Sequence, residues 1–176
     1  MEQPTAESQS VGHEHHRFET ATEALKAEHR VIEKVLDALE KLARTAESSV
    51  LADWAKAIDF ARNFADQCHH LKEEKLLFPA LEERGIPREG GPIGLMLAEH
   101  EEGRGYVRAM AAALEAAAQD PQELIGARTT LRRKADAYIR LLREHIQKED
   151  DVLFMLADGV LSGEDQKKLL REFEEH

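Results

Sequence analysis

Two segments of this chain, beginning at residues 68 and 144 and therefore 76 positions apart, follow one pattern: CHHLKEEKLLF and EHIQKEDDVLF. In a helix, residues four apart project from nearly the same face. Each segment therefore presents a histidine and a glutamate side by side on one helix face. The aligned positions are His69 with His145, Lys72 with Lys148, Glu73 with Glu149, Leu77 with Leu153 and Phe78 with Phe154.

A second repeated element precedes each of these segments. LKAEH at residues 25–29 and MLAEH at residues 96–100 share Ala-Glu-His. Each half of the chain is thus expected to be a helical hairpin, with a lone histidine on its first helix and a His-x-x-x-Glu pair on its second. Two such hairpins related by a pseudo-twofold axis would bring six side chains into one layer of the core: His29, His69, Glu73, His100, His145 and Glu149.

Hydrophobic periodicity supports this arrangement. Apolar residues recur every three or four positions over residues 20–47, 51–84, 93–119 and 122–158, which predicts four long helices, and a shorter helix is expected within residues 161–176. Long helices joined by short connections indicate an all-α fold, an antiparallel up-down-up-down four-helix bundle with a short extra C-terminal helix. The predicted organisation is a mobile tail at 1–19, the bundle at 20–160 and the short helix at 161–176.

Glycine, proline and capping residues indicate where the helices are expected to begin and end. Gly85 is a candidate left-handed C-cap, Pro121 opens a helix, and Gly159 is a candidate terminator. Ser162 with Asp165 forms a capping-box-like start. On the fourth helix the expected inward face consists of Tyr138, Leu142, His145, Glu149, Val152 and Leu156.

Charge and composition exclude several classes of function. With 35 acidic and 24 basic residues, the chain has a net charge of -11, which argues against binding to a phosphate backbone. No apolar run approaches the roughly 18 residues of a membrane span, so no membrane association is expected. A single cysteine, Cys68, excludes an internal disulfide, and the opening MEQPTAESQSVG does not read as a signal peptide, so we expect a cytoplasmic location.

A layer of buried imidazoles and carboxylates carries a heavy desolvation cost unless the groups are paired or bind metal. Any one of these residues alone is more often a hydrogen-bonded core histidine or a solvated acid. The joint pattern, however, favours a metal site. Four imidazoles and two carboxylates suit iron, manganese or zinc. If both glutamates bridge two ions, each ion also keeps two histidines.

The first segment contains two adjacent histidines and two adjacent glutamates, so two different His-x-x-x-Glu pairs could supply the ligands. His69 with Glu73 aligns with His145 and Glu149, whereas His70 with Glu74 has the same spacing but does not align with a second His-x-x-x-Glu pair. The repeat therefore favours His69 and Glu73 as ligands and predicts that His70 and Glu74 are not. The acids beside the lone histidines, Glu28 and Glu99, are expected at the surface or as partners that orient imidazoles.

Over residues 20–160 the chain resembles the hemerythrin-like, or HHE cation-binding, family. The resemblance is carried by AEH at 27–29, HHLKEEKLLFP at 69–79, AEHEEGR at 98–104 and HIQKEDDVLF at 145–154. It implies a bundle holding two iron ions, bridged by oxo or hydroxo and by the two glutamates. It also implies binding or reduction of a small diatomic or peroxide ligand such as O2, peroxide or NO. Iron itself is implied by the resemblance alone.

The chain departs from the oxygen-carrying hemerythrins, which place a further histidine four residues after the third-helix histidine, where Arg104 stands here. They also end in HxxxxD, which His145 and Asp150 imitate. Gly103 fits either space for a ligand or a close helix contact, and Tyr138 fits either a hydrogen-bond donor or a core tyrosine. Iron storage or delivery, repair of iron centres and a peroxidase- or catalase-like enzyme remain alternative functions. No protein partner is indicated.

Overall fold

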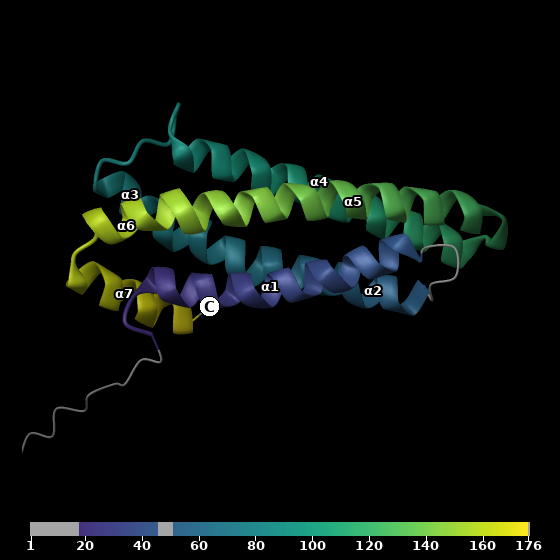
Figure 1. The fold of residues 1–176 in the computed structure, drawn as a ribbon, viewed down its shortest axis with the longest axis horizontal. Helices are drawn as coiled ribbons and strands as arrows, with labels where there is room; N and C mark the ends of the chain where they lie inside the picture. Colours follow the sequence, from purple (N-terminus) through teal and green to yellow (C-terminus); the bar gives the residue numbers. More distant parts are fainter. Residues whose placement is uncertain (1–17, 46–50, 176) are drawn as a thin grey trace, which may run out of the picture.

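The computed structural model describes residues 18–45 and 51–175, and within them all regular structure is helical, as predicted. The long segments lie side by side along the longest axis of the molecule, and α7 packs beside the start of α1 (Figure 1). Nearly all of the predicted tail at 1–19 lies outside the described residues, and the domain division stays a prediction. The elements are α1 (Ala21–Arg44); α2 (Leu51–Phe60), η1 (Ala61–His70), η2 (Glu73–Leu77) and α3 (Phe78–Glu83); α4 (Pro92–Gln119); η3 (Pro121–Glu123), α5 (Leu124–Lys148), η4 (Glu149–Leu153) and α6 (Phe154–Val160); and α7 (Gly163–Glu174).

Most of the predicted helix ends are confirmed. Gly85 has a φ of 89°, a conformation that glycine adopts without a Cβ penalty. Ser162 and Asp165 form a reciprocal capping box at the start of α7. Gly159, however, does not end its helix: α6 continues to Val160 and ends where Leu161 turns to extended backbone. Among residues 18–45 and 51–175, no helix combines the length and apolar content that crossing a bilayer requires.

Three segments, η1, η2 and η4, are π-helical, a conformation with i→i+5 hydrogen bonds that is frequent at functional sites. Two of them begin at the aligned glutamates, Glu73 and Glu149. A π turn accommodates one extra residue, so the inward face beyond it shifts along the sequence. The expectation that Val152 and Leu156 face the core is therefore wrong: they are 51% and 40% exposed, while Leu153, Phe154 and Ala157 are buried in their place.

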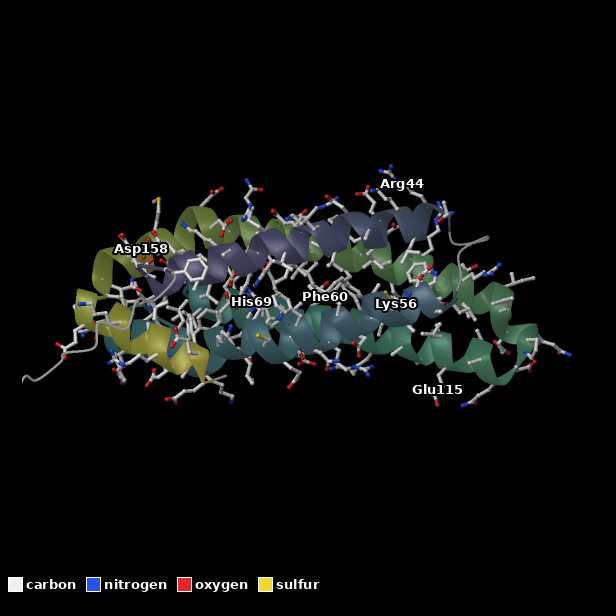
Figure 2. All side chains as sticks on the ribbon, turned by 90° about the horizontal axis from the view of Figure 1, so that it is seen from below. Arg44, Lys56, Phe60, His69, Glu115 and Asp158 are labelled. Atoms are coloured by element: carbon white, nitrogen blue, oxygen red, sulfur yellow. The ribbon has the colours of Figure 1, made fainter. Side chains whose placement is uncertain are left out.

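The apolar core is divided into two clusters, and His29 on α1 lies between them. Leu25, one turn before it, belongs to a cluster with Phe78, Phe154 and parts of α7, while Ile32, one turn after it, belongs to a cluster with Trp54 and residues of α4 and α5. Figure 2 shows His69 inside the bundle, whereas labelled residues such as Arg44 project outward. The polar layer is therefore enclosed by apolar packing on both sides.

The contact between Asp165, at the start of α7, and Arg84 gives a first testable prediction. Asp165 caps α7 and accepts hydrogen bonds from Arg84, which lower its pKa to about 2 from an ordinary value of 3.8. Because the folded-state pKa is depressed, this stabilisation is present above pH 3.8 and is lost as the pH falls through about 2. Asp165→Asn should lower the melting temperature at neutral pH, on the order of a few degrees. The difference from the wild type should shrink in acid, and a pH-independent difference in calorimetry would contradict this account.

Candidate metal centre

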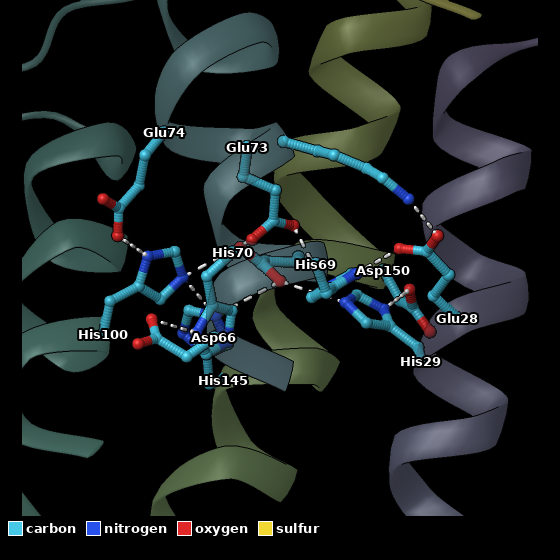
Figure 3. Close-up of polar contacts among 12 residues, drawn as sticks. Glu28, His29, Asp66, His69, His70, Glu73, Glu74, His100, His145 and Asp150 are labelled. Atoms are coloured by element: carbon cyan, nitrogen blue, oxygen red, sulfur yellow. Dashed lines mark hydrogen bonds and ion pairs between the residues drawn. The ribbon is translucent and has the colours of Figure 1, made fainter. Parts of the chain in front are cut away.

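All six residues predicted from the repeat converge in the bundle interior, and each is at most 1% exposed. They come from α1, the segment η1–η2, α4 and the segment α5–η4 (Figure 3). A seventh residue, His70, lies with them and is 4% exposed. The potential ligand atoms form two groups that share Glu73, and within each group they lie within 4.8 Å of one another. The groups are His70, Glu73, His100 and His145, and His29, His69, Glu73 and Glu149.

Glu73 reaches both groups with different oxygens. Its Oε1 lies 3.5 Å from Nε2 of His69, and its Oε2 lies 3.5 Å from Nε2 of His100. These distances are too long for strong hydrogen bonds. Two oxygens of one carboxylate facing two different imidazole groups is an arrangement suited to a bridge between two cations.

Glu149 occupies the corresponding position in the other half. Its Oε2 lies 3.2 Å from Nε2 of His29 and 3.3 Å from Nε2 of His145. His29 and His145 belong to different groups, so this carboxylate also lies between the two candidate ion positions. Both glutamates thus lie between histidines of the two groups, Glu73 through two oxygens and Glu149 through one.

Many polar atoms of this layer are buried and have no hydrogen-bond partner in the described structure. They include both carboxylate oxygens of Glu73 and of Glu149, and Nε2 of His29 and His69. Leaving such atoms unsatisfied costs about 1–3 kcal/mol each. Oxygen and imidazole nitrogen are the donors that iron, manganese or zinc accept. The site thus fits a pair of metal ions chemically.

An outer set of carboxylates orients four of the imidazoles. In each case the Nδ1–H of the histidine donates to a carboxylate oxygen, because an ionised carboxylate can only accept. The Nε2 atom of each ring is thereby directed inward, as in many metal-binding histidines, and Nε2 of His100 lies 3.0 Å from Nε2 of His145. The pairs, at 2.8–2.9 Å, are His29 with Asp150, His69 with Glu28, His100 with Glu74, and His145 with Glu99.

Cations hold these outer carboxylates in turn. Glu28 accepts from Lys72 and Glu99 accepts from Lys148, the two lysines that the repeat aligns. Burial alone would raise the pKa of both glutamates, but their histidine and lysine partners hold each pKa below its ordinary value. Of the two roles expected for Glu28 and Glu99, the orienting one is therefore observed. Sequence reasoning gave Lys72 and Lys148 no role, although their alignment was visible.

The aligned phenylalanines also belong to the site. Phe154 stacks on the ring of His29, with centroids 5.4 Å apart, and Phe78 stacks on His100, with centroids 6.0 Å apart. Each phenylalanine covers the lone histidine of the other half. The Leu-Phe pairs of the two segments thus help to fix ring orientation as well as to fill the core.

The predicted exclusion of His70 does not agree with the structure, which groups His70 with His100, His145 and Glu73. The ring of His70 stacks on that of His100, with centroids 3.9 Å apart. The physical reason is that η1 is π-helical, with more residues per turn, so adjacent side chains turn by a smaller angle and both His69 and His70 reach the interior. The exclusion of Glu74 agrees with its position outside His100.

Arg104 lies at the position where a further histidine was expected from the resemblance. Its guanidinium donates to Asp66 at 2.8 Å and to Glu74 at 2.7 Å. Asp66 approaches His70 and Glu74 binds His100, so one arginine supports the surroundings of two imidazoles in the same group. Neither Asp66 nor this role of Arg104 was indicated by the sequence pattern.

The two central glutamates are electrostatically unequal. Burial, followed by the charge of Glu149, raises the pKa of Glu73 well above its ordinary value. Burial acts in the same direction on Glu149, but His145 and His29 hold the pKa of Glu149 well below its ordinary value. Besides burial, the raised pKa of Glu73 reflects the negative charge of the carboxylates around it. Several carboxylates close together in an apolar surrounding favour the binding of cations.

The family described as "Hemerythrin HHE cation binding domain" matches residues 20–157. The uncharacterized proteins Rv1995 of Mycobacterium tuberculosis and Mb2018 of Mycobacterium bovis are each 29% identical over 160 residues, which is 89% of this chain and 60% of theirs. The chain therefore spans about three fifths of the length of these relatives.

Proposed function

Since the chain belongs to the hemerythrin HHE cation-binding family, we propose that it is a non-haem di-iron protein that binds or reduces a small ligand such as O2, peroxide or NO. Its scaffold in this proposal is an antiparallel up-down-up-down four-helix bundle. The observation that carries the proposal is the pair of buried, unsatisfied glutamates, each lying between imidazoles of two groups.

In this proposal one iron is held by His29 and His69, and the other by His100 and His145. Glu73 and Glu149 would be shared between the two ions, which an oxo or hydroxo group would also join. His70, which is grouped with His100 and His145, would give the second iron a third imidazole. The ion held by His29 and His69 then has one ligand fewer than its neighbour.

The bound iron pair would supply the electron transfer and the ligand-binding positions. The chain's own residues hold and orient the donors. The outer carboxylates keep each Nε2 available, Phe78 and Phe154 restrict ring rotation, and the two apolar clusters exclude bulk water. No described side chain in the layer is left to serve as a separate acid or base.

The test is the metal content of protein produced in iron-supplemented cells, measured by elemental analysis together with the near-ultraviolet absorption spectrum. We expect two irons per chain and an absorption band characteristic of an oxo-bridged pair. Titration with O2, NO and peroxide would then distinguish a carrier or sensor from an enzyme. Protein that takes up no stoichiometric metal, even after anaerobic reconstitution with iron, would refute the proposal.

A further inference from the structure

A cavity of about 290 Å³ lies beside the polar layer of histidines and glutamates, between η1 and α4. Tyr138 of α5 is also part of its wall. His70 is part of this wall and also belongs to one of the two ligand groups. His29, His69, His100 and His145 do not line it. His70 therefore separates the cavity from one candidate ion position.

His70 is held differently from the other four histidines. Its Nδ1 is buried and makes no hydrogen bond within the described structure, and the nearest carboxylate, Asp66, lies 3.8 Å away. The other four imidazoles donate from Nδ1 to a carboxylate at 2.8–2.9 Å. Asp66 is itself engaged by Arg104. An imidazole without an orienting partner is the one that turns away from a metal at the lowest cost.

Gly103 and Tyr138 are two further residues of the cavity wall. A Cβ at Gly103 would lie 3.5 Å from Cε2 of Tyr138 and 3.8 Å from Cδ2 of Leu141, ordinary contact distances, so close helix packing does not require the glycine. The hydroxyl of Tyr138 has no hydrogen-bond partner among the described residues, although the side chain is only 3% exposed. The wall that contains His70 therefore also contains a glycine that packing does not require and a tyrosine hydroxyl without a partner among the described residues.

We propose that His70 is a displaceable ligand and that small anions reach the metal pair through this cavity, binding to the iron of His100 and His145 in place of His70. The inference rests on the proposed di-iron centre. The step is a ligand exchange without a change of oxidation state: the iron–imidazole bond breaks, the iron–anion bond forms, and the released imidazole turns toward Asp66. Tyr138 donates a hydrogen bond to the bound anion.

The charges of the wall favour anions. It contains the guanidinium groups of Arg62, Arg104 and Arg108 and the single carboxylate of Asp66. Arg104 and Arg108 also pair with acids outside the wall, whereas Arg62 forms no ion pair among the described residues. Positive charge at the entrance of a cavity raises the local concentration of anions.

The first experiment compares His70→Ala with His69→Ala, using azide as the probe. His70→Ala should lose less iron than His69→Ala, because it removes one imidazole of three from its ion rather than one of two, and it should bind azide faster, by about tenfold if the site is open about a tenth of the time in the wild type. His69→Ala should lose iron. Elemental analysis and stopped-flow absorption measure the two quantities. Loss of iron from His70→Ala equal to that from His69→Ala would show that His70 is a fixed ligand and overturn the proposal.

The second experiment tests the route with a matched pair on α4. Gly103→Val fills the cavity beside Tyr138, whereas Gly105→Val makes the same change at a position outside the cavity wall, where a Cβ meets only Arg108. With equal iron content and comparable melting temperatures, azide association should slow only in Gly103→Val. Equal rates in the two variants would overturn the route. A wild type that binds no iron would instead overturn the proposed function.

Discussion

Replacing Glu73 by glutamine should reduce the iron content of the protein from two ions per chain to less than one. Glu73 belongs to both ligand groups, and its two oxygens face histidines of different groups. The amide keeps the volume of the side chain but removes the charge and one of the two anionic donors. Elemental analysis of purified and reconstituted protein measures the effect.

Glu74→Gln is the matched control, because Glu74 is the next residue and contacts the same histidine, His100, from the outside. Loss of an outer partner typically weakens metal affinity by about 10- to 100-fold without removing a ligand. Glu74→Gln should therefore hold two irons when iron is in excess. A Glu73→Gln protein that still binds two irons with an unchanged spectrum would refute the bridging assignment.

Removing the metal should lower the melting temperature by about 10 °C or more. A ligand at about 1,000 times its dissociation constant stabilises the folded state by about 4 kcal/mol, and 1 kcal/mol corresponds to roughly 2–4 °C for a chain of this size. The buried oxygens of Glu73 and Glu149 lack partners without cations, so the layer becomes the least favourable part of the core. Calorimetry of iron-loaded and chelator-treated protein tests this.

The control for the melting experiment is a double variant, Glu73→Gln with Glu149→Gln. Iron should leave its melting temperature unchanged, because both bridging carboxylates are gone. Equal melting temperatures of iron-loaded and metal-free wild-type protein would mean that the buried polar atoms are stable without metal. The energetic argument for a metal centre would then fail.

The sequence repeat was sufficient to find most residues of the candidate site. The aligned pairs and the two lone histidines predicted six residues, and all six meet in the interior. The helices and most of their caps were predictable as well, since Gly85 and the Ser162–Asp165 pair have strong local signatures. These features follow from the local residue types and the hydrophobic periodicity, both of which can be read from the sequence.

The π-helical segments were not predictable, because a 3.6-residue period was assumed throughout. That assumption misplaced Val152 and Leu156 and excluded His70. No aligned partner could have recovered His70: its counterpart in the repeat is Ile146, which is buried in apolar surroundings. Asp66 was missed because the arginine that donates to it, Arg104, lies on another helix. Asp150 was considered only together with His145, and its contact with His29 on α1 was not predicted.

The exchange of partners between the two halves ties metal loading to the assembly of the whole chain. His29 of the first half depends on Asp150 and Phe154 of the second, and His100 of the second depends on Glu74 and Phe78 of the first. Neither hairpin is therefore a complete chelator. The two halves should behave as complementary fragments, and release of the ions and separation of the hairpins become one cooperative event.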